Sequence, residues 1–383
     1  MRAREQMDKL LCWMNMPSHY QSAFFDALRS AGVNLVVHYY GRVGDDRKAM
    51  GWESSDQLSA GEAYVPSTLE AVHMCQDWKD RVHIVPGYGT PFTRQLAAFL
   101  SSQGVRWVHW SEPSHRGIKW WLSYPLKRWY ATLVNRHADG AFAIGELARR
   151  DFIRWGVRED KIRLLPYSSS RPPSGGNPNP TIDAFSRLWQ PLFLYVGALC
   201  ARKGIDVLLR AFAASVAQCH SGGLVLVGND TTNGEYHRLA SQLGIQKRVL
   251  FAGALASSAV YSALRSAQVF VLPSRFDGWG VVIAEAASVG RAVIASEACG
   301  AAQHLVITGE TGFRVVAGDA RSLADAMQQY MRDPGLARTH GERSLELWSE
   351  FSPEKNVERL LNGLHALRIR QSQRVGVKSA GLA

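Results

Sequence analysis

The chain has 383 residues, with 44 Lys and Arg against 33 Asp and Glu, and a formal net charge of +11. Its 46% hydrophobic and 20% charged residues are typical of a folded protein of two or three domains and exclude a disordered chain. The sequence holds no apolar run of about 18 residues, which argues against a membrane-spanning helix, while the positive charge leaves nucleic acid, an anionic membrane surface and a phosphorylated substrate open as partners.

The N-terminus and the cysteines favour a cytoplasmic location. Glu5 follows the first basic residues, and Asn15 and Pro17 soon interrupt the short apolar run after it, so we expect no cleaved signal peptide. The five cysteines are widely spaced and form no Cys-x-x-Cys pair. That spacing argues against a zinc ribbon or a disulfide framework and fits a reducing compartment.

The first half of the chain alternates short apolar runs with amphipathic segments. Residues 24–31 and 92–101 have the apolar spacing of helices. The apolar runs predict strands over residues 10–14, 34–38, 82–85, 105–110 and 140–144.

A breaker-rich stretch then divides the chain, because residues 171–180 hold four prolines and two glycines. We therefore predict an N-terminal domain of residues 1–171, a linker of residues 172–190 and a C-terminal domain of residues 191–350. Residues 351–383 would form a helix able to pack back on the N-terminal domain, and then a basic tail.

The second half shows the same alternation more clearly. Helices are predicted over residues 206–216, 258–266, 281–288 and 354–367, and strands over residues 192–196, 223–227, 249–251, 268–272 and 292–295. Continuous apolar strands between helices are buried on both faces, which predicts α/β domains with doubly wound parallel sheets. Ligands of two such domains, facing each other across a cleft, bind at the carboxyl ends of the strands.

Two glycine-containing loops in the second half carry charged residues. The loop after strand 192–196 runs from Gly197 through Arg202 and Lys203 to a helix, an arrangement that suits a diphosphate and equally an ordinary turn with a solvated basic pair. The loop after strand 268–272 carries Asp277, and Glu285 follows eight residues later on an otherwise apolar helix. A carboxylate there needs a partner, which a sugar or ribose diol, an arginine or solvent would supply.

A third stretch is punctuated by small residues. Strand 292–295 leads into Ser296 and other small side chains that let a ligand approach the backbone. Gly309 and Gly312 then predict a β-hairpin around residues 308–313.

Together these pieces resemble the nucleotide-sugar-binding domain of the family 4 retaining glycosyltransferases, the group 1 glycosyl transferases of GT-B fold. Five matching pieces run in order along the chain: Val-Gly-x-Leu-x-x-x-Lys-Gly, Phe251-x-Gly253, Pro-Ser-x-x-Asp-Gly-Trp-Gly with an acid eight residues on, Gly290-Arg291-Ala292-Val293-Ile294, and Gly309-x-Thr311-Gly312-Phe313. The resemblance implies two Rossmann-like domains facing across a cleft.

The resemblance also implies a role for each matching residue. Lys203, helped by Arg202, would hold the donor diphosphate. Asp277, in place of the first glutamate of the family's Glu-x7-Glu motif, would act near the donor sugar, and Glu285 would bind the ribose. The remaining donor-binding positions are Gly197, Phe251, Gly278, Gly280, Val281 and Val282.

Three positions depart from the family pattern. Ala198 stands where an arginine is frequent, Asp277 is one methylene shorter than glutamate, and His304 replaces an acid. A diphosphate contact could then be missing or come from Arg202, and the donor preference could differ.

The N-terminal half matches less of the pattern. Trp110-Ser111-Glu112 and Gly145-Glu146-Leu147-Ala148 resemble a subset of the family that acts on surface polysaccharides. This domain would supply acceptor contacts and a polar residue near the reacting sugar, for which Glu112 and His115 are the candidates and His19 a third. A satisfied loop carboxylate and surface histidines are the alternatives.

Part of the excess of positive charge lies in a basic and aromatic stretch. Residues 106–137 contain six Lys or Arg, a single acid and seven Trp or Tyr. Such residues suit the interface of an anionic bilayer, although several aromatics could belong to the core and some nucleic-acid-binding proteins share the pattern. The residues assigned to the acceptor or membrane side are His19, Lys119, Trp120, Trp121, Lys127 and Arg128.

We therefore expect a metal-independent retaining glycosyltransferase without a cofactor, peripheral on the inner face of the cell membrane. Its partners would be a nucleotide sugar and a glycan or lipid-linked acceptor, with no nucleic acid. A nucleotide-sugar epimerase or a glycoside phosphorylase of the same fold, and a basic nucleic-acid-binding protein, are the alternatives.

Overall fold

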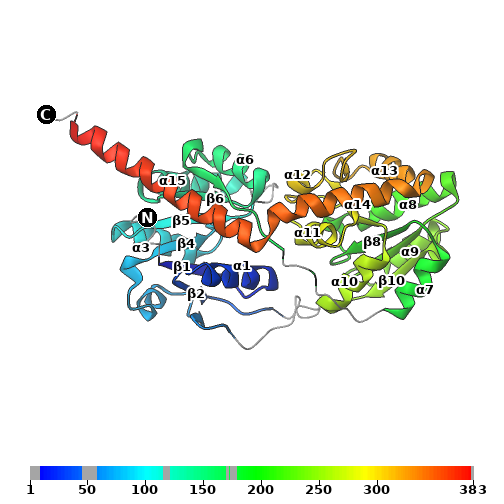
Figure 1. The fold of residues 1–383 in the computed structure, drawn as a ribbon, viewed down its shortest axis with the longest axis horizontal. Helices are drawn as coiled ribbons and strands as arrows, with labels where there is room; N and C mark the ends of the chain where they lie inside the picture. Colours follow the sequence, from blue (N-terminus) through cyan, green and yellow to red (C-terminus); the bar gives the residue numbers. More distant parts are fainter. Residues whose placement is uncertain (1–8, 45–57, 115–120, 170–171, 173–178, 381–383) are drawn as a thin grey trace. The chain divides into compact units, whose positions relative to one another are not determined.

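The computed structural model describes residues 9–44, 58–114, 121–169, 172 and 179–380. They form two compact units (Figure 1). The N-terminal unit contains the described residues up to Val43, residues 58–167, and the described residues from Pro353 onward. The C-terminal unit contains Ser168–Ser352.

The sheet of the N-terminal unit has seven parallel strands in the order β3-β2-β1-β4-β5-β6-β7. Its central strands are apolar and buried, as expected where helices cover both faces of a sheet. The strand order reverses between β1 and β4, which is where ligands bind in doubly wound sheets. The strands are β1 (Leu10–Met14), β2 (Leu35–Tyr39), β3 (Glu62–Tyr64), β4 (Val82–Pro86), β5 (Trp107–Ser111), β6 (Gly140–Ala143) and β7 (Ile162–Leu164).

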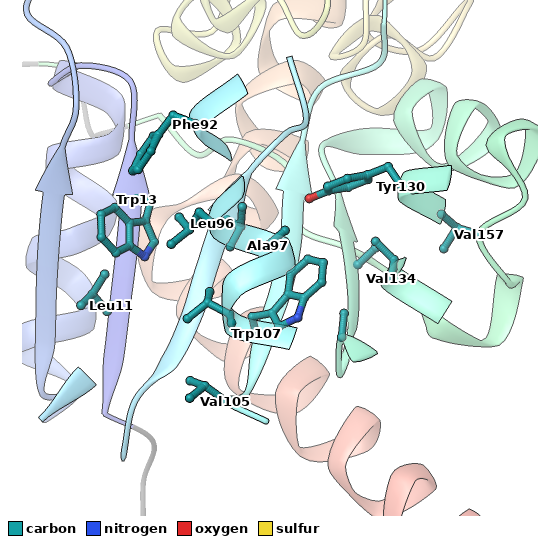
Figure 2. Close-up of a cluster of buried hydrophobic side chains, with 14 of the residues drawn as sticks. Leu11, Trp13, Phe92, Leu96, Ala97, Val105, Trp107, Tyr130, Val134 and Val157 are labelled. Carbon is teal, nitrogen blue, oxygen red and sulfur yellow. The ribbon is translucent and has the colours of Figure 1, made fainter. Parts of the chain in front are cut away.

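Helices of the N-terminal unit enclose an aromatic core. Figure 2 shows Trp13 of β1 and Trp107 of β5 among the side chains of α3 and α5, including Leu96 and Tyr130. Burying such large side chains stabilises the unit by about 2–3 kcal/mol each. The helices are α1 (His19–Ser30), α3 (Pro91–Ser102), α5 (Tyr124–His137), α6 (Gly145–Trp155) and α15 (Pro353–Ala380).

The long helix α15 belongs to the N-terminal unit and packs against α1 (Figure 1). The Asn356 amide donates a hydrogen bond to the Pro166 carbonyl oxygen at 2.6 Å. A Cβ atom at Gly363 would lie 2.5 Å from the Phe142 ring, so the helix backbone packs directly on β6. These contacts hold the first half of α15 against the N-terminal unit.

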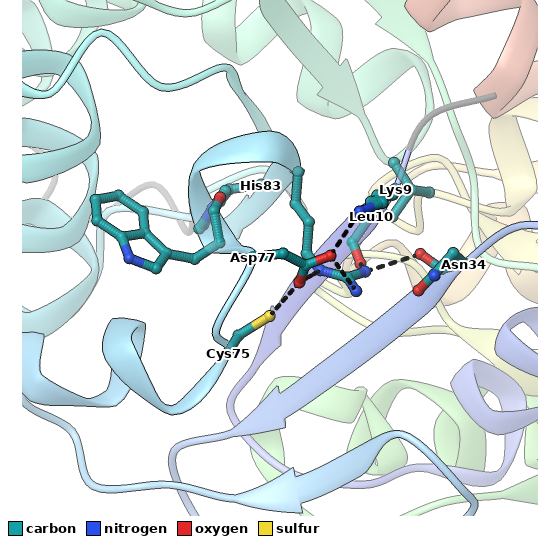
Figure 3. Close-up of polar contacts among 8 residues, drawn as sticks. Lys9, Leu10, Asn34, Cys75, Asp77 and His83 are labelled. Atoms are coloured by element: carbon teal, nitrogen blue, oxygen red, sulfur yellow. Dashed lines mark hydrogen bonds and ion pairs between the residues drawn. The ribbon is translucent and has the colours of Figure 1, made fainter. Parts of the chain in front are cut away.

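A buried arginine holds the amino ends of β1 and β2 together (Figure 3). The Arg81 guanidinium donates to the carbonyl oxygens of Leu10 and Asn34, and it forms an ion pair with Asp77. Lys9 also donates to Asp77 at 2.9 Å. Hydrogen bonds from Arg81 and Lys9 hold the pKa of Asp77 well below its usual range.

The sheet of the C-terminal unit has six parallel strands in the order β10-β9-β8-β11-β12-β13. Its strand order reverses between β8 and β11, so the loops after these two strands flank the switch point. The strands are β8 (Leu192–Val196), β9 (Gly223–Val227), β10 (Val249–Gly253), β11 (Val269–Leu272), β12 (Ala292–Ser296) and β13 (Gly312–Val315). The helices are α7 (Pro180–Leu188), α8 (Ile205–Cys219), α9 (Glu235–Gln242), α10 (Ser257–Ser266), α11 (Val281–Ser288), α12 (Ala302–Leu305), α13 (Ala320–Arg332) and α14 (Pro334–Trp348).

The predicted class of two doubly wound α/β domains is confirmed, but two local predictions differ from the structure. Residues 180–188, assigned to the linker, form α7, where Pro180 takes the first turn and the Asn179 side chain accepts a hydrogen bond from Ile182 N–H. The hairpin predicted at residues 308–313 is wrong. Gly309 and Gly312 form a tight turn, and β13 then pairs in parallel with β12.

Candidate functional site

The loops after β8 and β11 cross at the carboxyl edge of the C-terminal sheet. Gly204 has φ +73°, and a Cβ atom there would lie 2.4 Å from the Pro273 carbonyl oxygen, so only glycine fits the crossing. Two bonds lock it: Arg275 N–H donates to the Arg202 carbonyl oxygen at 2.9 Å, and the Arg202 guanidinium donates to the Phe276 carbonyl oxygen at 3.1 Å. The backbone thus positions the side chains of both loops together.

Lys203 and Asp277 meet at this crossing. The Lys203 ammonium donates to a carboxylate oxygen of Asp277, and the two side chains are only 15% and 14% exposed. The residues lie 74 positions apart in the sequence, and each was assigned to the donor site. The structure brings them together as one ion pair at the carboxyl edge of the C-terminal sheet.

A second ion pair, which the sequence analysis missed, supports the first. The Arg275 guanidinium binds both carboxylate oxygens of Asp206 at 2.7 Å each and also donates to the Ala201 carbonyl oxygen. Asp206 lies in the first turn of α8, and the hydrogen bonds from Arg275 are the main cause that lowers its pKa. The pattern around Asp206 and Arg275 carries no signal that would pair them.

Helix α11 begins directly beyond this crossing. Gly280 caps the helix with φ +84°, a conformation that leads the backbone sharply from Gly278 into Val281 and Val282. The first N–H groups of a helix have no intrahelical acceptor and favour an anion. The predicted donor-binding positions on this loop therefore lie at one helix N-terminus, close behind Asp277.

Glu285 lies on the second turn of α11 and is largely buried. Burial, and secondarily the Glu285 carboxylate, raise the pKa of Tyr261 on α10. The burial of Glu285 excludes the alternative of a solvent-facing side chain.

The loops after β9 and β10 complete the edge on the other side of β8. Phe251 stacks on His237 of α9 with ring centroids 3.7 Å apart, and His237 Nδ1 lies 3.7 Å from the Asp230 carboxylate. Asp230 also accepts hydrogen bonds from the N–H groups of Thr232 and Gly234. Sequence analysis found Phe251 and Gly197, which follows β8 directly, but it missed this His237 and Asp230 pair.

In the N-terminal unit, Glu112 is exposed and directly follows Ser111, the last residue of β5. His19 is the first residue of α1, in the segment that follows β1. His19 therefore follows the carboxyl end of β1, and Glu112 follows the carboxyl end of β5 in the same parallel sheet. His115, Lys119 and Trp120 lie outside the described residues.

The basic and aromatic stretch divides into core and surface. Trp107, Trp110 and Tyr130 are buried, whereas Trp121 and Trp129 are exposed, as is Arg128. The assignment of Lys127 to a membrane or acceptor surface is wrong, because its side chain is buried and its ammonium donates to Ser114. A charge on a helix was taken as solvated, but tertiary partners bury it.

The described parts of the chain contain no cluster of three or more His, Cys, Asp or Glu side chains arranged to hold a metal ion. No helix within those parts is both long and apolar enough to cross a membrane.

Two family models match the chain. The model of the glycosyl transferases group 1 matches residues 183–346, which contain the loop crossing, and the glycosyl transferase 4-like domain matches residues 56–168. Both matched domains are glycosyltransferase domains, and residues 183–346 belong to the group 1 glycosyltransferases. This membership confirms the family that the sequence motifs indicated.

Curated relatives of this glycosyltransferase family match parts of the chain. A lipopolysaccharide core biosynthesis mannosyltransferase, LpcC of Rhizobium leguminosarum bv. viciae, is 35% identical over 39% of this chain and 43% of its own length. A GDP-mannose-dependent alpha-(1-6)-phosphatidylinositol monomannoside mannosyltransferase of Mycolicibacterium smegmatis is 26% identical over 62% of this chain and 63% of its own length. The matched part of the chain thus spans less than half of the length of the first relative and less than two thirds of the length of the second.

Solved structures of glycosyltransferases match almost the whole chain. Anabaena HepE in complex with UDP has a TM-score of 0.74 and 18% identity over 94% of this chain and 100% of that chain. WaaG, a glycosyltransferase involved in lipopolysaccharide biosynthesis, has a TM-score of 0.60 and 16% identity over 92% and 98%. At these identities the likeness concerns the fold, and it confirms the predicted GT-B class.

Proposed function

We propose that this chain is a retaining glycosyltransferase that moves a sugar from a nucleotide-sugar donor to a lipid-linked or cell-surface polysaccharide precursor. The observation that carries the proposal is the crossing of the loops after β8 and β11, where Lys203, Asp277 and the start of α11 meet. Family membership and the name of HepE, a relative solved with UDP, support a nucleotide-sugar donor.

Lys203 and Arg202 would bind the donor diphosphate, together with the N–H groups of the first turn of α11. The diphosphate is the leaving group, so it needs stabilisation of developing negative charge more than it needs a strong acid. In a mechanism of this kind each preorganised donor lowers the barrier by about 3–4 kcal/mol. We propose that these groups suffice without a metal ion or another cofactor.

The two motif acids would bind hydroxyl groups of the donor. Asp277 lies at the crossing, where it pairs with Lys203. Once the Lys203 ammonium binds the diphosphate instead, the Asp277 carboxylate would accept hydrogen bonds from the sugar. Glu285, buried one helical turn further on, would accept from the ribose.

The transfer would keep the configuration of the sugar. The bond from the anomeric carbon to the diphosphate oxygen breaks, and the acceptor oxygen forms its bond on the same face. The acceptor hydroxyl proton passes to the departing diphosphate oxygen, so atoms and charge balance without an external base. Glu112 and His115 are the proposed polar residues of the acceptor side, with His19 as a third.

The acceptor side would lie on the cytoplasmic face of the cell membrane, with the protein peripheral to the bilayer. Trp121 and Arg128 are exposed on this part of the N-terminal unit, and tryptophan with arginine suits an anionic lipid interface. The names of relatives that act on lipopolysaccharide core and a phosphatidylinositol mannoside support a lipid-linked acceptor.

A thermal-shift panel of UDP-, GDP-, ADP- and TDP-sugars tests the proposal first. We expect one nucleotide to raise the melting temperature by several degrees and the variants Lys203→Ala and Glu285→Ala to lose transfer while staying folded. Stabilisation by none of the four, or near-wild-type turnover in either variant, would overturn the assignment.

A further inference from the structure

We propose that Lys127 and Asp151 are positioning residues that hold residues 111–114 in place and thereby aim Glu112 at the acceptor. This inference rests on the proposed function, since it assigns these residues to the acceptor half of the transfer. It concerns a buried polar network of the N-terminal unit that the donor site does not use.

Three elements of the N-terminal unit converge on Ser114. The Asp151 carboxylate of α6 accepts from Ser114 N–H at 2.8 Å and from Ser114 Oγ at 2.7 Å. The Lys127 ammonium of α5 donates to the same hydroxyl oxygen at 2.8 Å. The hydroxyl group therefore donates to one charged group and accepts from the other, which fixes its orientation.

Both charged side chains are almost fully buried, at 1% exposure for Lys127 and 2% for Asp151. The ammonium lies 5.7 Å from the Trp155 ring centroid and 6.0 Å from that of Tyr88, so cation–π attraction recovers part of its lost hydration. Desolvation of each ion still costs several kcal/mol, and apolar residues of similar volume commonly stabilise such a site as well or better. Stability alone therefore does not account for this network.

The other end of the segment is held as well. Ser111 Oγ is hydrogen-bonded to His109 Nε2 at 2.9 Å, and His109 Nδ1 lies 3.3 Å from the hydroxyl group of Tyr130. The Ser111 carbonyl oxygen accepts a hydrogen bond from Ile144 N–H at 3.1 Å, and Ser111 pairs with Ala143 of β6 at the end of β5. Glu112 stands between these two anchors with an exposed side chain. Its backbone direction is thus set by Ser111 on one side and by Ser114 on the other.

The decisive variant replaces both charges with apolar side chains of similar size, Lys127→Met with Asp151→Leu. We expect a folded protein that binds nucleoside diphosphate as the wild type does, because the donor residues lie in the other unit. Hydrogen exchange at Ser114 N–H should accelerate at least tenfold, and kcat for transfer should fall at least tenfold with the donor KM unchanged. The single variant Asp151→Asn keeps an acceptor oxygen. It should therefore retain most of the protection of Ser114 N–H against exchange and most of the wild-type kcat.

A matched control removes an ion pair of the same unit in which only the carboxylate is buried. Arg106 donates to the buried Asp139 at 2.9 Å at the amino end of β5, so Arg106→Met with Asp139→Leu should leave Ser114 exchange and kcat unchanged. Unchanged exchange at Ser114 in the Lys127 and Asp151 double variant, or an unchanged kcat with a released segment, would overturn the inference. A wild type that transfers no sugar would count against the proposed function instead, while the exchange rates still decide whether the two residues hold the segment.

Discussion

Lys203 and Asp277 form an ion pair across the crossing of the loops that follow β8 and β11. Each of these residues has a proposed role toward the donor, so in the donor-free chain each satisfies the other. A diphosphate must then compete with Asp277 for the ammonium group, and its arrival would release the carboxylate toward the sugar. In the proposed function, the pair would therefore couple recognition of the phosphate to recognition of the sugar.

This competition predicts opposite effects of two substitutions on nucleoside diphosphate binding. Asp277→Asn removes the competing charge and should tighten binding of the favoured nucleoside diphosphate several-fold, whereas Lys203→Ala should weaken it at least tenfold. Asp277→Asn should nevertheless lower kcat, because a contact to the sugar is lost. Isothermal titration calorimetry with the free diphosphate separates binding from turnover.

Arg275 offers the control for that titration, because it lies in the same loop but pairs with Asp206. Arg275→Lys keeps the positive charge and loses the bidentate geometry, so it should weaken diphosphate binding by the same factor in the Asp277→Asn variant and in the wild type. Weaker diphosphate binding in Asp277→Asn than in the wild type would contradict the competition.

The close approach of the two loops predicts a stability cost for a single added methyl group. Gly204→Ala places a Cβ atom 2.4 Å from the Pro273 carbonyl oxygen at a φ of +73°. Gly234→Ala introduces the same left-handed strain, at φ +82°, with no atom within 4 Å of the added group. The strain alone costs about 1–2 kcal/mol, so Gly204→Ala should lower the free energy of unfolding by clearly more than Gly234→Ala in urea titrations. An equal loss of unfolding free energy in the two variants would mean that the loops at the crossing move apart to accommodate the methyl group, which contradicts the prediction.

Much of the sheet architecture was predictable because the central strands are continuous apolar runs between breakers. The runs at Leu10–Met14 and Leu192–Val196 match β1 and β8 to the residue. The edge strand Glu62–Tyr64 is short and only partly buried, so it leaves no apolar run to detect. Strand β13 was missed because Gly309 before it and Gly312 at its start indicated a hairpin instead.

The candidate site was predictable residue by residue but not in its contacts. Local motifs indicated Lys203 and Asp277 separately, whereas their pairing depends on neighbouring strands that lie far apart in the sequence. Lys127 shows the opposite failure. Its partner Ser114 lies 13 residues away and cannot be identified from local pattern, so a buried ammonium resembled a surface charge.

Buried histidines of the N-terminal unit predict a loss of stability in mild acid. Burial lowers the pKa of His83 to about 4 and that of His109 to about 3. Above pH 6.5 both are neutral in the folded and the unfolded chain. As the pH falls below 6.5, the unfolded chain takes up protons that the folded chain does not, so each lowers the free energy of unfolding by up to about 1.4 kcal/mol per pH unit.

The range from pH 6.5 to 5 isolates this effect, because ordinary carboxyls titrate lower. The urea midpoint should fall with pH over that range, and His109→Phe should make the fall shallower. The exposed His137 provides the control, since His137→Gln should leave the slope as it is in the wild type. A slope that His109→Phe does not change would exclude His109 as a source.

The exposed apolar residues before α5 predict a membrane-binding face on the N-terminal unit alone. Leu122 and Trp121 are 77% and 73% exposed, and Leu188 of the C-terminal unit is 73% exposed. Leu122→Ser and Trp121→Ser should each weaken binding to vesicles with anionic lipid at least tenfold at low salt, because burial of either side chain in the interface contributes about 1.5–3 kcal/mol. Leu188→Ser removes a leucine of matching exposure and should leave vesicle co-sedimentation unchanged. Equal losses from the two leucine variants would place the lipid contact elsewhere.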